Sequence, residues 1–200
     1  EFEVDHAYDV KNNLVVLSKY GISGNYVITI GTIYPKKNIV RLIQAMASVD
    51  NDTSLLICCT AGINSESIFE APELFGVAPR VKFLGRVDTD DLKVLLSCAQ
   101  AFVFPSLYEG FGIPILESFS CRIPEVCSNL TSLPEIAGNG ACFFDPYSVA
   151  DIAQSINKVL HDFEYKTMLV SEGVSRLNDF SWEQSARSHK QFFKDIIEST

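Results

Sequence analysis

The stretch that decides the fold is Phe104-Pro105-Ser106-Leu107-Tyr108-Glu109-Gly110-Phe111-Gly112-Ile113-Pro114-Ile115-Leu116-Glu117. The apolar run at 101–104 has the length of a strand, and Pro105 ends it. Gly110 and Gly112 allow a tight turn, and Pro114 suits the first turn of a helix that begins near residue 113. The stretch therefore predicts a strand, a glycine-rich turn and a helix in direct succession.

The same alternation extends in both directions along the chain. Further apolar runs of strand length lie at 26–30, 54–59, 80–84, 124–127 and 141–144. Helical patterns lie at 10–20, 39–46, 88–98 and 133–137, from 149 onward, and twice more before the chain ends. This alternation predicts an α/β fold, a Rossmann-like parallel sheet with helices on both faces. Such sheets bind ligands beyond the carboxyl ends of their strands, which points to the loops after Ile30, Cys59, Leu84 and Phe104.

The pattern divides the chain into three segments. Residues 1–25 fit the alternation least well and are interpreted as a lead-in from another domain. Residues 26–180 form the predicted ligand-binding domain, and residues 181–200 its C-terminal helix, which begins with the capping-box spacing of Ser181 and Gln184. The apolar residues Phe192, Phe193 and Ile196 of this helix either contact a further domain or pack on the sheet of this one, and the sequence leaves both open.

The composition excludes several classes of protein. Lys plus Arg number 16 against 25 Asp plus Glu, a net charge of −9, so we expect no nucleic-acid partner. Three isolated histidines and six cysteines without CxxC spacing predict no metal site. With no apolar run that could span a bilayer and no secretory signal, we expect reduced cysteines and a cytoplasmic location. Walker A, GxGxxG, GxSxG and HExxH motifs are absent.

Two carboxylates accompany the glycine turn. Glu109 precedes it and Glu117 lies about one turn into the helix. They could flank a ligand held at the helix start, since carboxylates accept hydrogen bonds from sugar hydroxyls and helix N-termini favour anions. They could equally be acids that stabilise the helix dipole. The residue types alone leave these two interpretations about even.

Positive charges gather in two segments that contain no acid. Residues 26–49 carry Lys36, Lys37 and Arg41, and residues 74–87 carry Arg80, Lys82 and Arg86. Lys37 follows the first strand on the expected ligand side, which favours a role in binding an anion. For Arg41, Arg80 and Lys82, simple solvation is the favoured interpretation.

These residues also resemble a known family. The spacing Glu109-x7-Glu117 within Pro105–Pro114 resembles the signature of retaining GT-B glycosyltransferases of family GT4, and the resemblance extends from about residue 19 to 182. It includes 19–22, 30–38, 81–85, 132–135 and 180–183. The resemblance implies the C-terminal, donor-binding half of a GT-B fold. It further implies transfer of a hexose from a UDP- or GDP-linked sugar to a glycan or lipid-linked acceptor, in cell-surface polysaccharide biosynthesis.

The resemblance also implies roles for individual residues. Glu109 would hold hydroxyls of the transferred sugar and Lys37 would neutralise the departing diphosphate, which makes these two the expected catalytic residues. Glu117 would bind the nucleotide ribose, and the loop at Arg86 and Val87 would lie against the base. The other expected donor-binding residues lie in the loop after the first strand and in the glycine turn: Gly31, Thr32, Lys36, Gly110, Phe111, Gly112 and Ile113.

Three positions depart from the family pattern. Many relatives have Arg where this chain has Thr32, and Lys36 is expected to compensate. Arg122 stands where the family has Gly, which predicts strain at a helix end, and Glu125 stands where an apolar residue is usual. An Arg122–Glu125 pairing would relieve the burial of Glu125. These departures leave one alternative open, a non-catalytic nucleotide-sugar-binding or scaffold module.

A complete GT-B enzyme has two Rossmann-like domains, and 200 residues supply one. The resemblance therefore implies that the acceptor is read by an N-terminal domain outside this sequence, and that the 200-residue chain is inactive alone. It implies no metal cofactor. Peripheral association of the whole enzyme with the inner face of the membrane is a further expectation.

Overall fold

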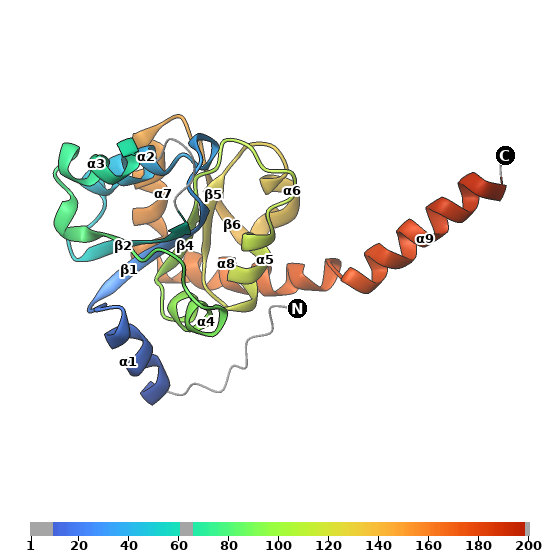
Figure 1. Cartoon of the computed structure of the whole chain (residues 1–200), viewed down its shortest axis with the longest axis horizontal. Helices are drawn as coiled ribbons and strands as arrows, with labels where there is room; N and C mark the ends of the chain where they lie inside the picture. Colours follow the sequence, from blue (N-terminus) through green and yellow to red (C-terminus); the bar gives the residue numbers. More distant parts are fainter. Residues whose placement is uncertain (1–9, 61–65, 199–200) are drawn as a thin grey trace.

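The computed structural model describes residues 10–60 and 66–198, and its centre is a six-stranded sheet (Figure 1). The strand order is β3-β2-β1-β4-β5-β6, and every neighbouring pair is parallel. The predicted Rossmann-like parallel sheet is therefore confirmed. The strands are β1 (Asn25–Thr32), β2 (Thr53–Thr60), β3 (Val81–Phe83), β4 (Ala101–Phe104), β5 (Glu125–Ser128) and β6 (Ala141–Phe144).

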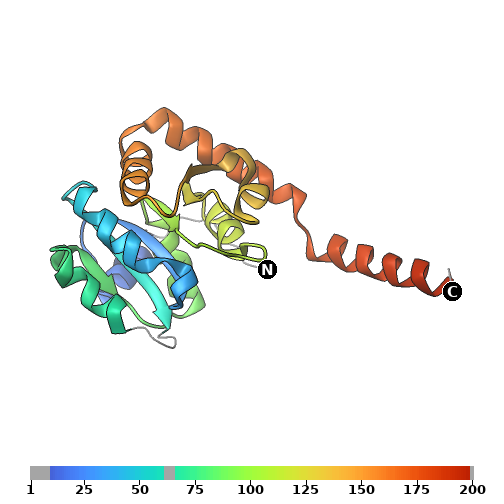
Figure 2. The same ribbon diagram turned by 90° about the horizontal axis from the view of Figure 1, so that it is seen from above.

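Helices connect the strands and cover both faces of the sheet (Figures 1 and 2). One face packs against α2, α3 and α7, and the other packs against α1, α4, α5 and α6. Successive strand residues supply the two cores in turn: Val27 belongs to the first core and Ile28 to the second. The helices are α1 (Val10–Lys19), α2 (Ile39–Ala45), α3 (Glu66–Leu74), α4 (Thr89–Ser97), α5 (Ile113–Ser120), α6 (Leu133–Ala137), α7 (Val149–His161), α8 (Phe163–Arg176) and α9 (Trp182–Glu198).

The connections reverse direction at the middle of the sheet. After β1 the chain builds outward through β2 to β3, and α4 then returns it to β4 on the other side of β1. The carboxyl ends of β1 and β4 are therefore neighbours from which the chain departs in opposite directions. This topological switch point is where open α/β sheets bind their ligands.

The N-terminal helix α1 is attached to this domain. Val16 is buried in the second core, Asp91 of α4 accepts hydrogen bonds from Lys19 (2.5 Å) and Tyr20 (2.8 Å), and the amine of Lys82 bonds the carbonyl of Gly21 (2.9 Å). Of the predicted lead-in segment, residues 1–9 lie outside the described residues.

Helix α9 extends away from the rest of the molecule (Figures 1 and 2), and none of its residues is buried. Its start is capped as predicted, because the N–H of Gln184 donates to the hydroxyl of Ser181 (3.3 Å). Phe192 and Phe193 are both 60% exposed, and Ile196 is 50% exposed. The alternative in which these side chains pack on the sheet of this domain is therefore wrong.

The structure corrects the sequence analysis at one helix. The sequence pattern assigned no helix between the second and third strands, yet α3 occupies Glu66–Leu74. Pro72 inside this helix removes a backbone donor and obscures the helical pattern. Burial of Ile68 and Ala71 against α2 and the sheet outweighs that cost.

The expected strain at Arg122 is present, but the pairing with Glu125 is not. Arg122 has φ +56°, and the N–H groups of Arg122 and Ile123 bond back to Phe119 and Ser118 in a Schellman motif, a position that glycine usually occupies. Glu125 is fully buried; Oε2 bonds the hydroxyl of Ser118 at 2.6 Å, and Oε1 has no hydrogen-bond partner among the described residues. Burial raises the pKa of Glu125 well above its usual value.

Candidate functional site

Two loops meet at the switch point of the sheet. The first follows β1 and runs through a short 3₁₀ turn at Pro35–Lys37, and the second follows β4 and leads into α5. The N–H of Leu107 in the second loop donates to the carbonyl of Lys36 in the first, at 2.7 Å. Residues 31–37 and 105–112, far apart in sequence, are thus joined side by side.

An ion pair between Lys37 and Glu109 joins the same two loops. The amine of Lys37 lies 2.7 Å from Oε1 of Glu109, and the two side chains are only 14% and 13% exposed. The amine also lies 4.7 Å from the ring centre of Phe104, at the end of β4. The two residues expected to be catalytic are therefore in direct contact and largely shielded from water, where a charge interacts strongly with its surroundings.

Gly31 makes room for this lysine. A Cβ atom at Gly31 would lie 3.3 Å from Cε of Lys37, and its φ of +144° lies in the region that favours glycine. A larger residue would be strained at this φ and would require the Lys37 side chain to shift by a few tenths of an ångström. The neighbouring Thr32 lies 3.5 Å from Thr60, hydroxyl to hydroxyl, and Lys36 is exposed on the same loop.

The glycine turn after Glu109 is open to solvent on one side. Gly112 adopts φ +114° and packs closely, since a Cβ atom there would lie 2.9 Å from Leu133. At Gly110 a Cβ atom would meet nothing within 4 Å, so the protein itself leaves space beside this residue. Among the described residues, the N–H groups of Gly110, Phe111 and Gly112 have no acceptor. Donors of this kind at a helix start favour anions and hydroxyl oxygens.

The remaining predicted residues lie in this turn, in α5 and in the loop before α4. Glu117 is half-buried in α5, and burial raises the pKa of its carboxyl. Ile113 and Phe111 are exposed at the start of the helix, 48% and 42%. In the loop between β3 and α4, Arg86 is exposed and Val87 packs partly against the second core. These residues share the carboxyl edge of the sheet, but only Lys37 and Glu109 are paired side chain to side chain.

Most of the other positive charges have structural roles. The guanidinium of Arg80 donates to the carbonyls of Met46, Val49, Asp50 and Thr53, so solvation is the wrong interpretation for this residue. Lys82 bonds the carbonyl of Gly21, and Arg41 bonds the amide oxygen of Asn38. The two acid-free segments thus contribute Lys36, Lys37 and Arg86, rather than six cations, to the ligand-binding edge.

Sequence reasoning did not identify the residues that hold the backbone of the glycine turn by hydrogen bonds. Thr131 and Ser132, in the loop between β5 and α6, bond to the backbone of Glu109 and Phe111. The sequence shows two small polar residues before a helix, a pattern common to many loops. Hydrogen bonds across more than 20 residues leave no local signal.

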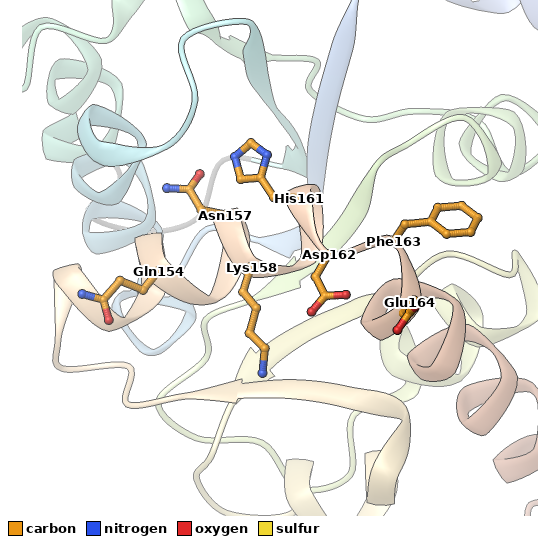
Figure 3. Close-up of a pocket in the computed structure, with 7 residues that line it drawn as sticks. All are labelled: Gln154, Asn157, Lys158, His161, Asp162, Phe163 and Glu164. Carbon is orange, nitrogen blue, oxygen red and sulfur yellow. The ribbon is translucent and has the colours of Figure 1, made fainter.

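A separate hollow of about 550 Å³ lies where α7 meets α8 (Figure 3). It is shallow, and several of its polar side chains already make contacts within the protein. Asn157 bonds the backbone of Ser48 and Asp50, Lys158 lies over the ring of Tyr165, and Asp162 caps α8. No convergent set of unused donors marks it as a binding site in the described part of the chain.

Within residues 10–60 and 66–198, no helix is long and apolar enough to cross a membrane. Nor do these residues gather three or more His, Cys, Asp or Glu side chains into a potential metal site.

Comparison with known proteins adds evidence from sequence and shape. The model of the family "Glycosyl transferases group 1" matches residues 19–175. O-antigen chain mannosyltransferase B from Escherichia coli is 37% identical over 175 residues, which are 85% of this chain and 46% of that protein. The chain therefore spans less than half the length of this relative.

Solved structures share the fold at low sequence identity. Anabaena Alr3699/HepE, determined in complex with UDP and glucose, matches this chain with a TM-score of 0.81 at 18% identity. The match covers all of this chain and 54% of the HepE chain. The C-terminal domain of LpcC from Francisella tularensis, a group 1 family protein, has a TM-score of 0.73 at 19% identity over 84% of this chain. The match covers 92% of that domain, so nearly the whole LpcC domain has a counterpart in this chain.

Proposed function

Because this chain belongs to the group 1 family of glycosyltransferases, we propose that it is the donor-binding part of a retaining hexosyltransferase. In this proposal a UDP- or GDP-linked sugar supplies the hexose, and a glycan or lipid-linked molecule accepts it in cell-surface polysaccharide biosynthesis. The observation that carries the proposal is the shielded Lys37–Glu109 pair beside an open turn with unused amide donors. One cation, one carboxylate and several N–H groups match a diphosphate joined to a polyhydroxylated ring.

The residues at the switch point would divide the donor among them. The amine of Lys37 would neutralise charge on the diphosphate as the bond to the sugar breaks, which stabilises the leaving group. The carboxylate of Glu109 would accept hydrogen bonds from sugar hydroxyls and so orient the ring. The amides at Gly110 and Gly112 would bind phosphate or hydroxyl oxygens without contributing a charge.

The nucleoside would extend toward the β3 side of the sheet. Glu117 would accept hydrogen bonds from the ribose, and Arg86 and Val87 would border the base. Gly31, Thr32 and Lys36 would line the phosphate path from the other loop, with Phe111 and Ile113 at its entrance. We propose that this donor site works without a metal cofactor, because a lysine already supplies the positive charge that the diphosphate requires.

The whole enzyme would require a second domain. The chain spans less than half of its Escherichia coli relative, which supports an acceptor-binding part elsewhere in the full-length protein. The exposed apolar side chains Trp182, Phe192 and Ile196 of α9 support a role for this helix in contacting that part. The 200-residue chain would then bind donor but transfer little, and the whole enzyme would act in the cytoplasm or peripherally at the inner face of the membrane.

The position of Glu125 weighs against the non-catalytic alternative. It rested on Arg122 and Glu125, which lie between the end of α5 and the start of β5. Glu125 pairs with Ala141, the first residue of β6, so it lies at the amino edge of the parallel sheet. The proposed donor site lies at the opposite, carboxyl edge, and the carboxylate of Glu125 bonds the hydroxyl of Ser118 rather than a residue of that site.

Calorimetric titration of the 200-residue chain with UDP-, GDP- and ADP-linked hexoses tests the donor site. We expect one of them to bind, and Glu117→Ala to weaken that affinity about ten-fold, through loss of a charge-assisted hydrogen bond to the ribose. Glu164→Ala, an exposed carboxylate on α8, is the matched control. Absence of binding at millimolar concentrations would disprove the donor site, and undiminished affinity in Glu117→Ala would disprove the ribose assignment.

A further inference from the structure

The turn that carries Glu109 is fixed by residues from another loop. The N–H of Glu109 donates to the hydroxyl of Thr131 at 3.1 Å. The hydroxyl of Ser132 lies 3.0 Å from the carbonyl of Glu109 and 2.8 Å from the carbonyl of Phe111, within donating distance of both. Three backbone groups of one short turn are therefore bonded to two consecutive side chains after β5.

These bonds determine where the Glu109 side chain points. A residue with both its N–H and its C=O held has both flanking peptide planes fixed, and the direction of its Cα–Cβ bond follows. The carboxylate is then only 13% exposed and bonded to Lys37. The backbone bonds thus set the direction of the side chain, and Lys37 holds its end.

The same bonds orient the amides of the glycine turn. In a trans peptide the N–H points opposite to the C=O. The carbonyls of Glu109 and Phe111 face Ser132, so the N–H groups of Gly110 and Gly112 point away from it. Those N–H groups have no acceptor among the described residues, and Gly110 itself is exposed, with no protein atom within 4 Å of where a Cβ would stand.

Backbone strain accompanies this arrangement. Thr131 adopts φ +54°, a left-handed conformation that is uncommon for a β-branched residue. Such strain persists where other interactions hold the residue in place. Asn or Gly would adopt this backbone more easily, but neither carries a hydroxyl in the position that accepts from Glu109.

We propose that Thr131 and Ser132 are positioning residues that determine affinity for the transferred sugar, an inference that rests on the proposed donor site. Thr131 acts through Glu109 and therefore affects contacts with sugar hydroxyls. Ser132 acts through the amides of Gly110 and Gly112, which reach phosphate and sugar oxygens alike. Neither residue contacts the ribose or the base in this arrangement.

Paired titrations of each variant test this inference, using the nucleoside diphosphate alone and the corresponding nucleotide sugar. Thr131→Val keeps the β-branched shape and the backbone strain but removes the hydroxyl, and Thr131→Ser keeps the hydroxyl. We expect Thr131→Val to bind the nucleotide sugar five- to ten-fold more weakly, as expected for one hydrogen bond. Its affinity for the nucleoside diphosphate should stay within two-fold of wild type, and Thr131→Ser should resemble wild type for both ligands.

Ser132→Ala should weaken both ligands, and Ser132→Thr should restore them. Equal loss of both ligands in Thr131→Val, or no loss of either, would overturn the positioning role. A wild-type chain that binds the diphosphate and the sugar form equally would also overturn it, since Glu109 would then make no sugar contact. If wild type binds neither ligand, the donor site itself fails, and the positioning role fails with it; that result is distinguishable because it appears before any substitution.

Discussion

Replacing Glu109 by Gln separates the two members of the shielded ion pair. Gln has nearly the same shape and can still accept a hydrogen bond from Lys37 through its amide oxygen. It lacks the negative charge that lies 2.7 Å from the lysine amine. An incoming diphosphate would no longer compete with a carboxylate for that amine. We therefore expect Glu109→Gln to bind UDP or GDP more tightly than wild type.

The geometry of the pair gives the size of this effect. A phosphate oxygen bonded to the amine of Lys37 beside Glu109 would lie about 4.5 Å from the carboxylate, for two bonds of ordinary length at a tetrahedral angle. Two unit charges at that distance repel by about 1 kcal/mol in water and about 4 kcal/mol at the lower effective dielectric of a protein surface. The smaller value already corresponds to roughly five-fold tighter binding.

Calorimetric titration with the nucleoside diphosphate measures this change directly. Glu164→Gln serves as the control, because it removes one negative charge from the same acidic chain at an exposed residue of α8. We expect at least five-fold tighter binding for Glu109→Gln and less than two-fold change for the control. The nucleotide sugar should gain less, because its hydroxyls lose a charged acceptor. Unchanged or weaker binding of the diphosphate by Glu109→Gln would refute the assignment of Lys37 to the diphosphate.

Three further predictions concern stability and are measured by chemical denaturation. Burial raises the pKa of Glu125 in the folded protein, so its stabilising contribution is full below about pH 4.3, the ordinary pKa of a glutamate, and is lost as the pH rises toward the raised value. Wild type should therefore lose stability relative to Glu125→Gln as the pH rises above about 4.3. Arg122→Gly should be more stable than Arg122→Ala by about 1 kcal/mol, because φ is +56° there. Replacing Phe193 and Ile196 together by Ser should change the free energy of unfolding by less than about 0.5 kcal/mol, since both side chains are exposed.

The fold was largely predictable because each strand is a short apolar run bounded by turn residues. Residues 101–104 and 141–144 were predicted as strands and are strands with those bounds. Buried parallel strands are apolar on both faces, so their sequence signal is strong. Helix α3 lacked such a signal, because Pro72 interrupts its pattern and its stability comes from burial of Ile68 and Ala71 against distant residues.

Charge was a weaker guide than hydrophobicity. A sequence shows where a positive residue lies but not which acceptor it contacts. Arg80 lies one residue before β3 and bonds carbonyls at the end of α2 and the start of β2. Lys37 lies in an equally basic segment and bonds a carboxylate across the switch point. The difference depends on the direction of each side chain in the folded chain, which a count of charges does not contain.

The contact between Lys37 and Glu109 has a consequence for the order of events in the proposed reaction. A nucleotide sugar offers Lys37 a diphosphate and Glu109 a set of hydroxyls, so each member of the pair exchanges its partner for another. After transfer, the nucleoside diphosphate offers Glu109 no hydroxyls, and the repulsion between the carboxylate and the diphosphate is no longer offset by a sugar contact. The same 2.7 Å pair would therefore favour the donor over the product and assist product release. Slower product release in Glu109→Gln follows from the tighter diphosphate binding predicted above, because differences in affinity among variants of one site lie mostly in the dissociation rate.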